Sequence, residues 1–216
     1  MGRRKVRKPA DYEQRKNRFV IEVESGVVLD FAKIFGNNNP VHLEIGSGKG
    51  EFITRKSREN REINFVGIEL DSDRITTILK ILDIAEDSNV RLLNHFVDKN
   101  IIQVIPQFFF PVIYIQHPDP WPKRKHHKYR LINQDFIDTL NLLLEPNGTV
   151  EIATDHSDYS EWIIEHFEER ADFQALFANG FTFERQPGHI ETYFEEVKRE
   201  EGFEPRFMFY KKLQTK

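Results

Sequence analysis

The chain contains no cysteine among its 216 residues. This absence excludes disulfide bonds, a thiolate nucleophile and a zinc site built on cysteine ligands. No run of apolar residues is long enough to span a bilayer. The N-terminal segment is basic but lacks the apolar stretch of a secretory signal peptide. We therefore expect a cytoplasmic protein, and we predict no metal site and no membrane partner.

Charge is distributed unevenly along the chain. The net charge of −4 does not by itself indicate a nucleic-acid-binding protein. Residues 1–20 nevertheless form a basic arm, which we expect to be flexible. Phosphate contact with a polyanion and a solvated tail explain this arm equally well. We expect residues 21–216 to form one domain, because a chain of 216 residues with 39% hydrophobic content can build a full core.

A strand pattern runs into a glycine-rich turn in the first quarter of the chain. Apolar and polar residues alternate over residues 41–45, which indicates a strand. Gly46, Gly48 and Gly50 follow, and an expected helix begins directly after them. A strand, a glycine turn and a helix N-terminus together are typical of a nucleotide-type cofactor site.

The spacing of this turn separates two classes of cofactor. A dinucleotide-binding fingerprint requires a small residue where Glu51 stands, and the third glycine comes one position early, at Gly50. An acid, Glu44, also lies two residues before the first glycine. This compact pattern resembles the first motif of class I S-adenosylmethionine (SAM) methyltransferases. SAM carries a sulfonium and an ammonium group, and both favour acidic neighbours. The glycines alone are equally compatible with an ordinary tight strand-to-helix turn.

Two further acids follow expected strands. The second strand, residues 63–70, ends near Glu69, which lies 19 residues after Gly50. An acid at this place can accept hydrogen bonds from ribose hydroxyls, although a strand-end acid facing water is common. Asp98 follows the third strand and can accept from an adenine amino group. It can equally cap the helix expected over residues 99–105, and one side chain can do both.

Residues 117–130 form the most unusual stretch of the chain. Three prolines in five positions exclude a helix or a central strand and hold Asp119 and Trp121 in a stiff segment. This segment follows an expected strand, at the edge where open α/β sheets bind ligands. Lysines, arginines and histidines follow over residues 123–130 without an acid. The alternative is a proline-braced surface loop without a function.

At these residues the chain resembles the tRNA (guanine-N7)-methyltransferases. Residues 118–121 match the PDPW motif of that family, and a basic stretch follows it. Residues 154–155 are similar to the T-D motif of the family, and residues 192–195 are similar to its T-x-x-E motif. Two departures are Gln116-His117 before PDPW and Tyr129, where the family often has a basic residue.

The resemblance runs from Val41 to the end of the chain. It implies an α/β fold with a single doubly wound, mostly parallel seven-stranded sheet and helices on both faces. It also implies methyl transfer from SAM to N7 of a guanosine in the variable loop of tRNA, with Asp119 as the catalytic residue. The implied contacts are, for the cofactor, Glu44, Gly46, Gly48, Glu69, Asp98 and Asp119, and, for the substrate, Lys123, Asp155, Thr192 and Glu195. We further expect Asp119, Asp155 and Glu195 to converge on one pocket that adjoins the glycine turn.

Three other functions compete with this interpretation. A SAM-dependent enzyme acting on a small molecule or a protein has no need of the basic arm and loop. A non-catalytic RNA-binding subunit of the same fold has no need of Glu44, Glu69 and Asp119. A nicotinamide-dependent dehydrogenase is disfavoured by Glu51. The sequence leaves the oligomeric state, monomer or homodimer, open.

Overall fold

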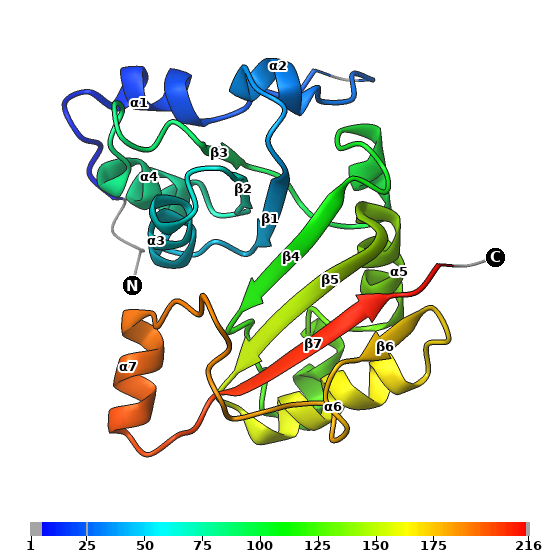
Figure 1. Ribbon diagram of the computed structural model, residues 1–216. Coiled ribbons are helices and arrows are strands. Elements are labelled where there is room, and N and C mark those ends of the chain that lie inside the picture. Colours follow the sequence, from blue (N-terminus) through cyan, green and yellow to red (C-terminus); the bar gives the residue numbers. More distant parts are fainter. Residues whose placement is uncertain (1–5, 25, 215–216) are drawn as a thin grey trace.

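One seven-stranded sheet forms the centre of the computed structural model, which describes residues 6–24 and 26–214 (Figure 1). The strands are β1 (Val41–Ile45), β2 (Asn64–Ile68), β3 (Val90–Leu93), β4 (Phe110–Gln116), β5 (Leu144–Thr154), β6 (Phe173–Ala175) and β7 (Arg206–Lys212). Their order is β3-β2-β1-β4-β5-β7-β6, and β7 runs antiparallel to both of its neighbours. All other pairings are parallel.

Helices cover both faces of the sheet. The first face packs against α1 (Tyr12–Phe19), α3 (Glu51–Glu59) and α4 (Ser72–Ile81). The second face packs against α2 (Phe31–Phe35), the 3₁₀ helix η1 (Lys99–Gln103), α5 (Gln134–Leu143) and α6 (Ser157–Glu168). A second 3₁₀ helix, η2 (Arg124–Tyr129), precedes α5. The helix α7 (Tyr193–Glu200) lies past the carboxyl ends of β4 and β5, outside both layers (Figure 1). This arrangement confirms the predicted fold class.

The alternation in β1 explains how the sheet serves two cores. Val41, Leu43 and Ile45 join the core on the α5 side. His42 points to the opposite face, where its ring meets those of Phe65 and Tyr114. Since side chains alternate along a strand, Glu44 lies on the same α3 side as His42. An acid is thereby placed inside the core, directly before the glycine turn.

The N-terminal arm differs from the expected flexible tail. Residues 1–5, which include three of its basic side chains, lie outside the described residues. From Tyr12 onward the arm forms α1, and its Phe19 is fully buried against the α4 side of the core. Arg15 donates hydrogen bonds to the carbonyls of Leu79 and Leu82 at the end of α4. These contacts explain why residues 12–19 form a docked helix. In the described ranges, no helix has the length and apolarity needed to cross a membrane.

Candidate functional site

A cleft of about 730 Å³ opens at the carboxyl edge of the sheet, where the strand order reverses between β1 and β4. Open α/β sheets bind ligands at this switch point, and the volume suits a nucleoside-sized cofactor. Gly46, Glu69, Asp98 and Asp119 line the cleft, as the sequence predicted for cofactor contacts. The other predicted cofactor residues, Glu44 and Gly48, are not part of its lining.

The glycine turn uses its glycines in different ways. Gly46, Gly48 and Gly50 all have positive φ angles, of 81°, 54° and 82°, so each favours glycine. A Cβ on Gly50 would lie 2.7 Å from side-chain carbons of Ile78, so this glycine lets α3 pack against α4. A Cβ on Gly46 would meet nothing within 4 Å. Gly46 therefore leaves open space at the wall of the cleft.

Glu44 tests whether this site suits a cationic cofactor. Its side chain is only 2% exposed, and Oε2 finds no hydrogen-bond partner among the described residues. Burial, with the charge of Glu69 acting in the same direction, raises the pKa of Glu44 to about 7. The Ser47 hydroxyl opposes this rise in the pKa only in part. A buried carboxylate oxygen without a hydrogen bond is costly unless a cation or donor compensates it. The ammonium and sulfonium groups of SAM provide such compensation, so the residues present fit this cofactor.

We expect Glu44→Gln to stabilise the free protein at about pH 8. The pKa of Glu44 rises from 4.5 to about 7 on folding. Between pH 4.5 and about pH 7, the folded state therefore binds more protons than the unfolded state, and stability falls as the pH rises through this range. Removing the ionisable group removes this loss, which amounts to at most about 3 kcal/mol. Thermal unfolding of both proteins across this pH range measures the effect.

A cofactor titration extends this test. A bound ammonium favours the ionised carboxylate, so SAM binding near pH 6 should release a proton from wild type but not from Glu44→Gln. Glu151→Gln is the matched control variant. Burial also raises the pKa of Glu151 to about 7, but Glu151 lies outside the cleft. Calorimetry in buffers of different ionisation enthalpy measures the released proton. Equal proton release from wild type and Glu44→Gln would remove Glu44 from the cofactor site.

Glu69 ties the glycine turn to the end of β2. Its Oε2 accepts a hydrogen bond from the Gly48 amide at 2.8 Å, and its Oε1 accepts one from the Asp71 amide at 2.9 Å. Arg74 Nη1 lies 3.7 Å from Oε2. Glu69 therefore fixes the position of Gly48 and still lines the cleft. Its predicted ribose contact stays a prediction.

Asp98 lines the cleft and caps a helix. Its Oδ1 accepts a hydrogen bond from the Asn100 amide at 2.9 Å, at the start of η1. The predicted cap is thus present, on a 3₁₀ helix that ends at Gln103. The predicted contact with adenine stays a prediction, and the position of Asp98 in the lining is compatible with both roles.

The proline-rich loop presents Asp119 and Trp121 to the cleft. Asp119 is exposed and makes no hydrogen bond or ion pair with any residue in the described part of the chain. His117 and Trp121 have positive φ angles of 48° and 43°, a strained conformation for side chains of this size. Such strain persists only where surrounding contacts enforce it.

Arg130 supplies those contacts, and the sequence did not reveal its role. It is the last residue of the basic stretch 123–130, but it is only 2% exposed. Its Nε donates to the Pro120 carbonyl at 2.9 Å, and its Nη2 pairs with Asp158. Its guanidinium also lies 5.0 Å from the ring centroids of both Tyr159 and Trp162. Arg130 thus anchors the proline-rich loop to α6.

The remaining basic residues of this segment are on the surface. Lys123, Arg124, Lys125 and Lys128 are all exposed. Lys128 lines the cleft, whereas Lys123, the predicted substrate contact, does not. These side chains are available to a polyanion beside the cleft mouth.

Asp155 reaches the cleft through His117. The predicted strand-end acid lies 3.4 Å from His117 Nδ1, and His117 lines the cleft. Burial raises the pKa of Asp155, but the hydrogen bond and charge of His117 outweigh it and leave the pKa below its usual range. The ring of His117 also packs against Phe194 on α7, and the two ring centroids lie 4.8 Å apart.

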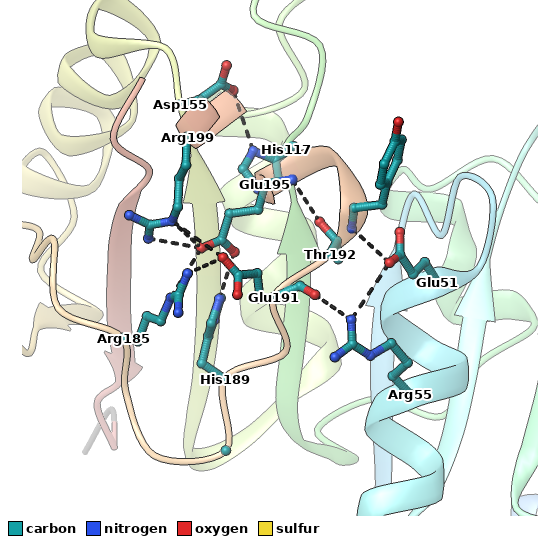
Figure 2. Close-up of polar contacts among 12 residues, drawn as sticks. Glu51, Arg55, His117, Asp155, Arg185, His189, Glu191, Thr192, Glu195 and Arg199 are labelled. Carbon is teal, nitrogen blue, oxygen red and sulfur yellow. Dashed lines mark hydrogen bonds and ion pairs between the residues drawn. The ribbon is translucent and has the colours of Figure 1, made fainter. Parts of the chain in front are cut away.

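Thr192 and Glu195 build α7 in this structure (Figure 2). Thr192 is the N-cap, and its side chain accepts a hydrogen bond from the Glu195 amide at 3.2 Å. The threonine of the T-x-x-E pattern therefore serves as the N-cap of α7, while the side chain of its glutamate is bonded elsewhere. The Glu195 carboxylate is 1% exposed and accepts from His189 at 2.7 Å and from Arg199 at 2.9 Å, with Arg185 3.6 Å away.

Glu195 consequently does not line the cleft. The expected convergence of three carboxylates on one pocket is wrong for this residue, because His189, Arg199 and Arg185, which are all within ten residues of it along the chain, enclose its carboxylate. Burial raises the pKa of Glu195, but hydrogen bonds from His189 and Arg199 outweigh it and hold that pKa below its usual range. Asp119 and the Asp155–His117 pair remain together at the cleft.

Helix α3 holds the segment before α7, a second contribution that the sequence did not reveal (Figure 2). Glu51 Oε1 accepts a hydrogen bond from the Tyr193 amide at 2.7 Å. Arg55 donates to the Glu191 carbonyl, and Lys56 donates to that of Gly188. The helix that follows the glycine turn is thereby tied to α7. In the sequence, the unusual acid at position 51 was the only sign that α3 has such a role.

Comparisons with known proteins agree with this site. A family model described as a putative methyltransferase matches residues 38–204. A tRNA (guanine-N(7)-)-methyltransferase of Bacillus licheniformis is 32% identical over 190 residues, which cover 86% of this chain and 87% of that protein. This chain belongs to that family. The family predicted from the PDPW segment is thereby confirmed.

Further members of the tRNA (guanine-N7)-methyltransferase family match at similar levels. The one from Oceanobacillus iheyensis is 36% identical over 160 residues, which cover 73% of each chain. The one from Bacillus subtilis is 30% identical over 191 residues, which cover 88% of this chain and 82% of that protein.

Solved structures share the fold of this family member. The antibiotic-resistance methyltransferase Kmr aligns with a TM-score of 0.59 at 12% identity, over 90% of this chain and 99% of that one. A 16S rRNA (adenine(1408)-N(1))-methyltransferase from Catenulisporales acidiphilia, solved with its cosubstrate SAM, gives a TM-score of 0.56 at 15% identity, over 90% and 97%. At these identities the likeness concerns the fold alone.

Proposed function

We propose that this chain transfers a methyl group from SAM to N7 of a guanosine in the variable loop of tRNA, giving 7-methylguanosine in the cytoplasm. The observation that carries this proposal is Asp119, an exposed acid at the cleft without a hydrogen bond or ion pair to the described residues. The loop that presents it continues directly into an exposed basic segment. The names of the relatives from Bacillus licheniformis and Bacillus subtilis support the same substrate.

Four acidic residues account for the cofactor. Bound SAM supplies a methyl group that its sulfonium charge makes electrophilic. Glu44, buried without a partner for Oε2, balances positive charge beside the glycine turn. Glu69, which holds Gly48, would accept hydrogen bonds from the ribose hydroxyls, and Asp98 would accept one from the adenine amino group. Asp119 lines the same cleft and would contact both the cofactor and the guanine.

The chemistry of guanine explains why no general base is needed. N7 carries a lone pair in the ring plane and no proton, so it would attack the methyl carbon of bound SAM directly as the methyl C–S bond breaks. The chain therefore contributes positioning, which can be worth about 7–11 kcal/mol. Asp119 orients the guanine and stabilises the positive charge that the ring gains on methylation.

Base selection follows from the donors of guanine. Its Watson–Crick edge presents N1–H and an exocyclic amine, and the carboxylate of Asp155 can accept hydrogen bonds from them. Adenine presents an acceptor at N1 and is rejected by a carboxylate. Lys123 binds a phosphate of the tRNA near this base. Thr192 and Glu195 position α7, whose Phe194 packs on His117, and their predicted contact with the base stays a prediction.

Incubation with labelled SAM and unmodified tRNA, followed by nucleoside analysis, tests the proposal. We expect the label in 7-methylguanosine. Label in another nucleoside would favour a different RNA methyltransferase activity. Absence of label from every tRNA, although SAM and tRNA both bind, would favour a non-catalytic RNA-binding subunit.

The basic segment gives a prediction for tRNA binding. Replacing Lys123, Arg124 and Lys125 with alanine should weaken tRNA binding and leave SAM binding intact. Three lost phosphate contacts should make the slope of log K against log salt shallower by about 2–3 units, at roughly 0.7–0.9 per contact. Filter binding over a range of salt concentrations measures this slope.

A charge-matched control distinguishes local contacts from net charge. Lys33, Arg61 and Lys80 are exposed and belong to helices or turns at the amino edge of the sheet, away from the cleft. Their replacement changes the net charge equally and should leave the slope nearly unchanged. If both triple variants lose the same slope, the segment after Trp121 does not contact phosphate specifically.

A further inference from the structure

Two exposed aromatic rings stand at the cleft beside Asp119. Trp121 is 37% exposed and Tyr129 is 55% exposed, and both line the cleft. Their ring centroids lie 5.3 Å apart with the planes at 56°. His126 lies beside both rings, at 5.8 Å from Trp121 and 6.0 Å from Tyr129. Neither the cofactor contacts nor the phosphate contacts described above use these rings.

The loop holds this aromatic pair outward. Trp121 has a φ of 43°, so its backbone keeps a conformation that bulky side chains avoid. Arg130, buried between Tyr159 and Trp162, binds the carbonyl of Pro120 directly before it. An apolar ring that is fixed in an exposed position has not collapsed onto the core. This is typical of a ligand contact rather than of a structural tryptophan.

The reaction creates a ligand that suits aromatic faces. When N7 gains a methyl group, the ring lone pair forms the new N–C bond while the methyl C–S bond breaks. The electron pair of that bond stays on the sulfur of the neutral leaving group, S-adenosylhomocysteine, and the guanine acquires the positive charge that SAM had carried. Ring faces of tryptophan and tyrosine attract cations. The ammonium of Lys128 already lies 5.2 Å from the Tyr129 ring centroid, so this ring accepts a cation in the structure. Because Lys128 is exposed, its ammonium can turn toward solvent and a base can take its place.

We propose that Trp121 and Tyr129 form a subsite that stacks on the guanine and binds its methylated, cationic form more tightly than its neutral form. Neutral guanine gains only the stacking contact, whereas the charged ring also gains the cation–π attraction. Since the charge develops in the transition state, this difference favours the transition state over the bound substrate. This inference rests on the proposed function and adds a specific role for the residue that departs from the family pattern, Tyr129.

Binding of substrate and product tRNA tests the subsite. We compare the Kd of an unmodified transcript with that of the same transcript carrying 7-methylguanosine, both with S-adenosylhomocysteine so that no methyl transfer occurs. Wild type should bind the product about 3- to 30-fold more tightly, the range expected for an added cation–π contact. Trp121→Leu should bring this ratio close to one. Trp121→Phe keeps an aromatic face and should retain most of it.

Matched variants separate the charge effect from simple loss of contact. Tyr129→Leu should reduce the ratio partly, and its single-turnover rate should fall by a similar factor. Phe203 is 49% exposed and lies outside the cleft, so Phe203→Ala should change neither the ratio of the two Kd values nor the single-turnover rate. A wild-type ratio of one, or an unchanged ratio in Trp121→Leu, overturns the subsite. If the chain forms 7-methylguanosine in tRNA but gives either result, the proposed function stands and only this inference fails.

Discussion

Asp119→Ala is expected to lower kcat for tRNA methylation by about 10²–10³-fold, the usual effect of removing one electrostatic contact to a transition state. Asp119 is exposed and has no hydrogen bond or ion pair to the described residues, so its loss breaks nothing within the fold. The free energy of unfolding should therefore stay within about 0.5 kcal/mol of wild type. Single-turnover kinetics with saturating SAM and tRNA measures the rate, and thermal unfolding measures the stability.

Two further variants separate charge from shape. Asp119→Asn keeps the size of the side chain and one acceptor but removes the negative charge. We expect the kcat of Asp119→Asn to lie between those of wild type and the alanine variant, because the methylated guanine is cationic. Glu62 is an exposed acid before β2, at the opposite edge of the sheet, and Glu62→Ala should have wild-type kinetics. A wild-type kcat for Asp119→Ala would remove this residue from the chemistry and with it the main support for the proposed mechanism.

The sheet was largely predictable from the sequence because its signals are local. Alternating or continuous apolar runs predicted β1 and β2, and these strands end at Ile45 and Ile68, directly before Gly46 and Glu69. In a doubly wound sheet, the carboxyl ends of adjacent strands meet at one edge. This rule alone was sufficient to bring Gly46, Glu69, Asp98 and Asp119 to one cleft.

The part of the site built by α7 was not predictable, for a physical reason. Glu195 looks like a free acid in the sequence, but His189 and Arg199 surround it once the chain has folded. Arg199 is a local partner, four residues along α7, but the contact with His189 depends on how residues 180–192 fold back toward α7. The tie from Glu51 to Tyr193 spans 142 residues and is equally invisible in the sequence.

This tie links the two halves of the site. Helix α3 begins directly at Gly50, the last glycine of the turn, and its side chains hold the segment that leads into α7. Phe194 on α7 in turn packs on His117, which pairs with Asp155. A continuous set of contacts therefore runs from the cofactor turn to the acids assigned to guanine. A displacement of α3 would move both.

Arg130→Ala is expected to destabilise the fold by about 2–4 kcal/mol, since it removes a buried side chain and leaves a cavity between two aromatic rings. It should also lower kcat, because the Pro120 carbonyl loses its donor and the loop that carries Asp119 loses its anchor. Arg130→Lys keeps the charge but not the planar guanidinium that bonds Pro120 and Asp158 together. It should fold more stably than the alanine variant and still show a reduced kcat.

The salt dependence of tRNA binding decides between anchoring and phosphate contact. Arg130 is buried, so Arg130→Lys should leave the slope of log K against log salt as in wild type. The Lys123, Arg124 and Lys125 triple variant should instead lose slope while it keeps kcat at saturating tRNA. These opposite patterns follow because Arg130 acts on Asp119 through the loop, whereas the three exposed cations act on the polyanion. A shallower slope in Arg130→Lys, with an unchanged kcat, would mean that Arg130 contacts phosphate and does not anchor the loop.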